Sequence, residues 1–79
     1  MIDIIINFMN SNDNYIIIHD INYDLISLQK ILCKKLNNCY IYTFINNDNY
    51  HNIAYQIYNN KIFCLYKQNN KCISIWKIK

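Results

Sequence analysis

The spacing of apolar residues changes along the chain and predicts its elements. Residues 2–8 (IDIIINF) alternate weakly and residues 15–18 (YIII) form a short apolar run, so we predict a strand in each segment. The polar run at 9–14 separates them, and its Asn and Asp residues adopt turn conformations more readily than other residues that carry a side chain. The first part of the chain is therefore expected to be a pair of strands.

The spacing becomes helical over residues 23–37. One apolar stripe is formed by Leu25, Leu28, Leu32 and Leu36. Asn22 is the expected N-cap, and Asp24 then places a carboxylate in the first turn, where it stabilises the helix dipole. The opposite face is polar and contains Ser27, Lys30, Lys34 and Asn37. The Asn pair at 37–38 stands where a helix usually ends in Gly.

After this helix the apolar residues alternate again. The expected strands cover residues 39–45, 53–58, 61–67 and 72–78. The Asn-Asn pairs at 59–60 and 69–70 are hairpin signals. This order, β-β-α-β-β-β-β, predicts an α+β fold: one small antiparallel sheet with one main helix packed on one face. Residues 1–79 are expected to form a single domain.

The composition excludes many enzymes by what it lacks. The chain has no Gly, Pro, Val, Arg or Glu, and Ile and Asn together fill 33 of its 79 positions. Without Gly, phosphate-binding loops, dinucleotide fingerprints and nucleophile elbows are excluded. Each of these motifs has Gly at fixed positions, where the backbone must approach a ligand closely or take a positive φ. The abundant residues are those of A- and T-rich codons, which indicates a base-biased genome. We expect no enzyme activity, no cofactor and no metal site.

Cysteine and histidine supply the remaining candidate chemistry. The four cysteines, at 33, 39, 64 and 72, do not have the spacing of zinc or iron–sulfur sites. We expect reduced thiols, since the N-terminus lacks the basic segment and cleavage site of a secretory signal. His19 and His51 are expected to be ordinary turn or strand-end residues. A small enzyme using Cys and His remains an alternative.

Positive charge is concentrated in two places. The net charge is +3, all five Asp lie within residues 3–48, and five of the eight Lys lie in the last 19 residues. The lysine face of the helix has no Glu to pair with, which would suit an anionic partner. Aromatic and lysine residues also alternate in the second half of the chain. They are candidates for a base-stacking platform, or are ordinary strand residues: Tyr40, Tyr42, Tyr55, Tyr58, Lys61, Tyr66, Lys67, Lys71, Trp76 and Lys77.

From residue 14 onward, the segments NYIIIHD (14–20), LISLQKILCKKL (25–36), CYIYTFI (39–45) and NKIFCLYKQNNK (60–71) together resemble the bacterial-type large-subunit ribosomal protein L-twenty-three family. Residues 14–20 (NYIIIHD) are similar to the family's N-x-Y-x-F-x-V strand, and the helix at 25–36 to its lysine-bearing helix. Residues 39–45 stand where the family has V-x-V-V-x-V-N-T. Residues 60–71 are similar to its K-K-A-x-V-T-L-x-x-G-x-K hairpin, with Asn69 in place of the usual Gly. The opening P-I-x-T-E-K motif is missing, and the tip between the middle strands is reduced to residues 46–52.

This resemblance implies a structural protein that binds large-subunit rRNA beside neighbouring ribosomal proteins. The base-biased composition then fits an organelle with an AT-rich, plastid-like genome, or otherwise the cytoplasm; no apolar run approaches the roughly 18 residues of a membrane span. The expected RNA-binding residues are Lys30, Lys34, Lys35, Asn46, Asn47, Asn49, Tyr50, His51, Lys61 and Lys71. The main alternative is a small protein-interaction module or inhibitor from a virus or mobile element.

Overall fold

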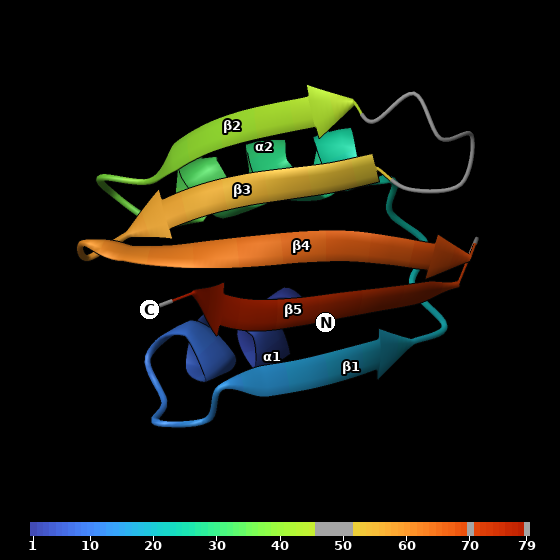
Figure 1. The fold of residues 1–79 in the computed structure, drawn as a ribbon, viewed down its shortest axis with the longest axis horizontal. Coiled ribbons are helices and arrows are strands. Elements are labelled where there is room, and N and C mark those ends of the chain that lie inside the picture. The colour runs from blue at the N-terminus through green and yellow to red at the C-terminus, as the bar shows by residue number, and fades with distance from the viewer. Residues whose placement is uncertain (46–51, 70, 79) are drawn as a thin grey trace.

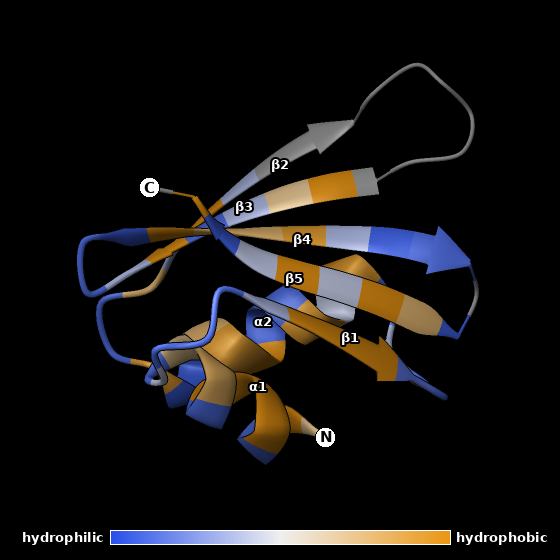
Figure 2. Cartoon of the chain, turned by 60° about the horizontal axis from the view of Figure 1, so that its bottom comes forward, coloured by the Kyte–Doolittle hydropathy of each residue, from blue (hydrophilic) through white to orange (hydrophobic). Residues whose placement is uncertain are grey.

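The protein is an α+β structure with one antiparallel sheet and two helices, as a computed structural model describes for residues 1–45, 52–69 and 71–78 (Figure 1). The elements in chain order are α1 (Ile2–Met9), β1 (Tyr15–His19), α2 (Leu25–Lys35), β2 (Tyr40–Ile45), β3 (Asn52–Tyr58), β4 (Lys61–Asn69) and β5 (Cys72–Ile78). The sheet order is β1-β5-β4-β3-β2, so the first strand returns to pair with the last. Both helices lie on the same face of the sheet (Figure 2).

The first segment contradicts the sequence-based prediction, because residues 2–9 form a helix and not a strand. Its alternation was weak, and a second spacing was present in the same residues: Ile5, Phe8 and Met9 follow i, i+3, i+4 and are all buried. Four of the eight residues of α1 are β-branched Ile, which helices disfavour slightly. Burial of this face against the sheet outweighs that preference, so the order is α-β-α-β-β-β-β.

Helix α2 confirms the predicted apolar stripe and corrects its cap. Leu25, Leu28 and Leu32 are buried, as is Leu36 just beyond the helix. The N-cap is Asp24 and not Asn22: the Asp24 carboxylate accepts a hydrogen bond from the backbone N–H of Ser27 at 2.6 Å. The helix therefore begins two residues later than predicted, with Asp24 itself satisfying one of the free N–H groups of the first turn.

Asparagine takes the place of glycine at the tight turns. Asn59 and Asn60 have φ of 50° and 61° and join β3 to β4, which matches the two-residue hairpin turn that needs positive φ at both positions. Asn38 has φ of 68° just after α2, at the end where Gly is usual. At the next hairpin, residue 70 lies outside the described residues. Before it, the pairing of β4 with β5 shifts between Lys67 and Asn69.

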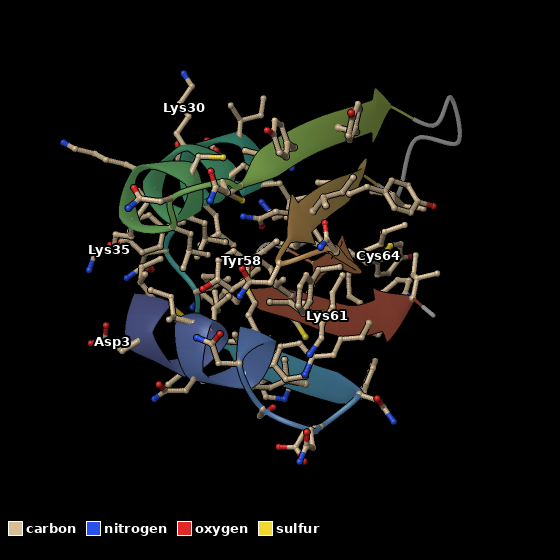
Figure 3. All side chains as sticks on the ribbon, turned by 90° about the vertical axis from the view of Figure 1, so that its left-hand side faces the viewer. Asp3, Lys30, Lys35, Tyr58, Lys61 and Cys64 are labelled. Atoms are coloured by element: carbon tan, nitrogen blue, oxygen red, sulfur yellow. The ribbon has the colours of Figure 1, made fainter. Side chains whose placement is uncertain are left out.

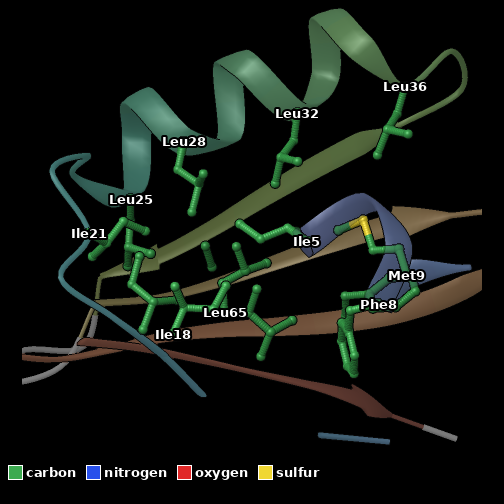
Figure 4. Close-up of a cluster of buried hydrophobic side chains, with 14 residues drawn as sticks. Ile5, Phe8, Met9, Ile18, Ile21, Leu25, Leu28, Leu32, Leu36 and Leu65 are labelled. Carbon is green, nitrogen blue, oxygen red and sulfur yellow. The ribbon is translucent and has the colours of Figure 1, made fainter. Parts of the chain in front are cut away.

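The hydrophobic core lies between the two helices and the sheet (Figure 4). The helices contribute Ile5, Phe8, Met9, Leu25, Leu28 and Leu32, and the sheet contributes Ile18, Ala54, Phe63, Leu65, Ile73 and Ile75. The rings of Phe8 and Phe63 meet edge to face, with centroids 6.3 Å apart. This contact fixes α1 against the middle of the sheet. Neither helix in the described chain has the length and apolar character needed to cross a bilayer.

Candidate binding surfaces

Lysine and aromatic side chains that alternate in the sequence lie on opposite faces of the sheet. Successive residues of a strand point to opposite sides, so Lys61 and Lys67 share the helix-covered side with Phe63, whereas Tyr66 points to the other side. Tyr58 also packs against the core on the helix side. The interleaved platform of lysines and aromatics is therefore not formed. The other candidate aromatic residues, Tyr40, Tyr42, Tyr55, Tyr66 and Trp76, instead lie on a separate surface.

This surface, which we call the open face, is the side of the sheet that neither helix covers (Figure 2). The strand register arranges its side chains in three rows. The longest row crosses all five strands: Tyr15, Trp76, Cys64, Tyr55 and Tyr42. Beside it lie two shorter rows, one of Ile17, Ser74, Tyr66 and Ile53, the other of Ile78, Ile62, Ile57 and Tyr40. None of these side chains is charged.

The large side chains of the open face are accessible, whereas the small ones between them are not. Tyr40, Tyr42 and Tyr15 are 62 %, 53 % and 52 % exposed, but Cys64 is only 1 % exposed. The aromatic rings therefore cover the small residues at the middle of the sheet. The Tyr66 and Trp76 rings lie with centroids 6.4 Å apart. The sequence analysis missed this surface as a unit, although the two-residue period over 61–67 already assigned lysines and Tyr66 to different faces.

The predicted lysines of α2 lie on the opposite side of the molecule. Lys30, Lys34 and Lys35 are exposed, and no ion pair within 4.0 Å joins any of them to a carboxylate in the described chain (Figure 3). Lys30 and Lys67 contribute to a lowered pKa of Asp24, but the main cause is the hydrogen bond from the Ser27 backbone N–H. The three lysines are thus exposed on the polar side of the helix, opposite its buried leucines.

Lys61 lies in a polar hollow at one end of the sheet, together with a lysine that was not among the predicted contacts. The hollow has a volume of about 270 Å³ and is lined by Ser11, Asn12, Asn14, Lys61, Lys77 and Ile78. The Lys77 ammonium donates to the Ser11 carbonyl oxygen and stands 4.8 Å from the centroid of the Phe8 ring. Burial, and then repulsion from Lys61, lower the pKa of Lys77, while Asp13 acts in the other direction.

Lys71 lies at the other end of β4. It lines a second hollow of about 260 Å³ with Asp24 and Lys67, next to the start of α2. Because β4 spans nine residues, Lys61 and Lys71 are roughly 30 Å apart and cannot contact the same phosphate. The structure therefore does not bring the predicted lysines into one cluster. The expected tip contacts Asn46, Asn47, Asn49, Tyr50 and His51 lie outside the described residues.

The four cysteines are free thiols, and burial disfavours the thiolate form of two of them, Cys33 and Cys64. The Cys33 thiol donates to the Cys39 carbonyl oxygen at 3.5 Å, and burial together with the neighbouring Cys39 thiol raises the pKa of Cys33 to about 11. Burial also raises the pKa of Cys64. His19 is the cross-strand neighbour of Cys72, but the Cys72 thiol donates to Gln68 Oε1 at 3.3 Å. In the described segments no three His, Cys or Asp side chains are close enough to hold a metal ion.

Comparison of the chain with protein-family models finds no match, and comparisons with curated proteins and with solved structures find none either.

Proposed function

We propose that the protein is a structural RNA-binding protein with no chemistry of its own, which docks through the lysine face of α2. The observation that supports this proposal most directly is the separation of charge. Lys30, Lys34 and Lys35 stand exposed on the helix side, and no carboxylate of the described segments forms an ion pair with them, whereas the side chains of the open face carry no charge. A cationic face without compensating carboxylates attracts a polyanion, and lysine contacts to phosphate position a protein on RNA without reading its sequence.

The polar hollow at the end of the sheet adds a second point of contact. Lys61 and Lys77 share it with Asn12 and Asn14, two residues whose side chains carry amide donors. Burial, and then repulsion from Lys61, lower the pKa of Lys77, and a phosphate bound there would offset that repulsion. The docking surface then extends from α2 around one end of the sheet. Lys71 contacts the RNA separately, at the far end of β4.

The finer proposal is that this RNA is large-subunit rRNA and that the protein is a component of an organellar ribosome. It rests on the similarity of residues 14–20, 25–36, 39–45 and 60–71 to the L-twenty-three family. The base-biased composition supports a plastid-like genome. Neighbouring ribosomal proteins are then further partners.

The test is a salt titration of binding to an rRNA fragment. Replacing both Lys30 and Lys34 by Gln should weaken binding and reduce the slope of log affinity against log salt by about 1.5, since each lost phosphate contact removes roughly 0.7–0.9. Lys67→Gln is a comparison from outside α2: because Lys67 shares its hollow with Lys71, it should lower the affinity less than the Lys30/Lys34 variant does. An unchanged affinity and slope in the Lys30/Lys34 variant would show that α2 is not the docking face.

A second candidate function, a protein-interaction module or inhibitor, is favoured by the uncharged aromatic open face. Interface centres are enriched in Tyr and Trp and depleted of Lys and Asp, as this face is. Purification of the tagged protein from its source cells separates the two functions. Co-purification of ribosomal particles supports the first, and a single stoichiometric protein supports the second.

A further inference from the structure

The open face differs from the face that a single sheet normally turns to water. An antiparallel sheet with helices on one side usually alternates apolar and polar residues, so that the uncovered side is polar. Here the uncovered side contains Tyr, Trp, Ile, Cys and Ser, with His19 and Asn69 in the row at one end, and none of the lysines in the described strands lies on it. Strands that are apolar on both faces are typical of a sheet that is covered on both sides.

We propose that the open face is covered by the open face of a second copy of this chain. The first argument is charge. A chain with net charge +3 repels its copy, and helix α2, which bears the exposed Lys30, Lys34 and Lys35, lies on the side of the sheet away from the open face (Figure 2). Two copies that meet through their open faces keep these lysines as far apart as the fold allows, and no unpaired charge is buried. An RNA strand on the same face would find aromatic rings but no ammonium group for its phosphates.

The second argument is area. The six most exposed side chains of the face are Tyr15, Ile17, Tyr40, Tyr42, Ile62 and Ile78, each at least 36 % exposed. Together with the half-buried Tyr55, Tyr66 and Trp76 and neighbouring Ile residues, these side chains give the open face on the order of 700 Å² of solvent-accessible surface that a partner could bury. A stable interface of standard size buries about 800 Å² on each partner. The open face alone therefore comes close to what a dimer needs.

The third argument is closure. Two such sheets packed face to face, about 10 Å apart, form a β-sandwich whose aromatic rows lie between the sheets. Each chain has one open face, because α1 and α2 cover the other. The pairing uses the same patch on both copies and is complete with two chains. This inference does not depend on RNA binding; it leaves the lysine faces of both copies outward, where they could bind one polyanion together.

The first experiment measures mass and the environment of Trp76 over a range of concentrations. Trp76 is the only Trp in the sequence and lies in the longest row of the open face. We expect sedimentation equilibrium to give twice the 9.6 kDa of one chain at high concentration. On dilution, the fluorescence of Trp76 should shift to the red and become more sensitive to acrylamide over the same range in which the mass falls, because the dimer interface shields the indole.

The second experiment places a charge on the face. Tyr42 lies on edge strand β2 and is 53 % exposed, so the ammonium of a Tyr42→Lys variant remains hydrated in the monomer. In the dimer the same group would be buried without a partner, and we expect the dissociation constant to rise at least about tenfold. Tyr15→Lys tests the opposite edge in the same way. The matched control is Ile26→Lys, because Ile26 is 59 % exposed on α2, outside the open face, and this variant should remain dimeric.

The outcomes separate the possible occupants. Circular dichroism first confirms that each variant is folded. A chain that stays monomeric at every concentration, with Trp76 always accessible, would overturn the proposal. So would a dimer that folded Tyr42→Lys and Tyr15→Lys variants leave intact, since it would use another surface. If the chain is monomeric and an oligonucleotide quenches Trp76, the open face is a stacking platform for RNA; if one different protein shields Trp76, it is a heteromeric interface.

Discussion

The two faces of the sheet are built from the same five strands but have different side chains. On the covered face, Phe63, Leu65, Ile73 and Ile75 are fully buried against the helices. On the open face, the neighbouring positions along the same strands carry Tyr66 and Trp76, and the edges carry half-exposed tyrosines. The two faces also differ in polar residues: the amide side chain of Gln56 and the charged Lys77 lie on the covered side.

This difference reflects what each face must contact. Aliphatic and Phe side chains interdigitate with helix side chains, and any loss of volume there leaves a cavity. Tyr and Trp combine a large apolar body with a polar group, so they tolerate water in the monomer and still gain from burial against a partner. The covered face therefore holds the monomer together, whereas the open face is suited to association. The following substitutions test that division of roles.

The largest effect is expected on the covered face, at Phe63. Phe63→Ala removes a ring that is 0 % exposed and packs edge to face with Phe8, so it should lower the free energy of unfolding by about 3–5 kcal/mol. Urea unfolding followed by circular dichroism measures this loss. A cost below about 1 kcal/mol would show that the contact between α1 and the sheet does not hold the fold together.

A smaller effect of opposite sign is expected at Gln56, a fully buried polar residue on the covered face. Gln56 is 0 % exposed; its Nε2 donates to the Cys39 sulfur, but its Oε1 has no hydrogen-bond partner in the described structure. Gln56→Leu keeps the volume and removes the unsatisfied acceptor, so we expect a gain of about 1 kcal/mol in the free energy of unfolding. The control is Gln56→Ala, which leaves a cavity and should destabilise. If Gln56→Leu destabilises the protein instead, the amide is satisfied in solution.

The N-cap of α2 should contribute to the stability of the folded protein by an amount that depends on pH. The Ser27 backbone N–H holds the pKa of Asp24 below its usual 3.8, so the ionised carboxylate stabilises the folded state. This contribution is complete above pH 3.8 and is lost as the pH falls through the lower pKa of the folded state. Asp24→Ala should therefore be less stable than the wild type at neutral pH, and the difference in stability between the two should become smaller as the pH falls.

Asp24→Asn separates the cap from the charge. The Asn amide oxygen accepts the same hydrogen bond, so this variant should stay close to the wild type at neutral pH. Thermal unfolding between pH 2 and pH 7 measures both variants. If the difference in stability between Asp24→Ala and the wild type stays constant across this range, the ionisation of Asp24 does not stabilise the folded state.

The smallest effect is expected on the open face of the monomer. Tyr42→Thr removes a cross-strand pair with Tyr55 but opens no cavity, so at concentrations where the chain is monomeric it should cost about 0.5 kcal/mol. Urea unfolding of dilute protein gives this value. A loss as large as that of Phe63→Ala would show that the open face stabilises the monomer as much as the core does, and the proposed division of roles would be wrong.

Part of the fold was predictable because the responsible interactions are local. The leucine stripe of α2 and the alternating segments of β2 to β5 follow from side-chain geometry within each element. The pair Asn59-Asn60 marked its hairpin because few residues other than Gly accept positive φ. The exposure of Lys30 and Lys34 follows from the same stripe, since they lie opposite its buried leucines.

The sequence by itself determined the α+β class, the second helix, all five strands of the sheet, β1 among them, and the exposure of the lysines of α2. Only the tertiary structure decided that residues 2–9 are helical, because Ile-rich segments suit either element and burial of Ile5 and Phe8 against the sheet makes the choice. It also decided that both helices cover the same face. That arrangement separates the lysines from the aromatics, because a strand's period defines two faces but only packing against other elements determines which of them stays uncovered.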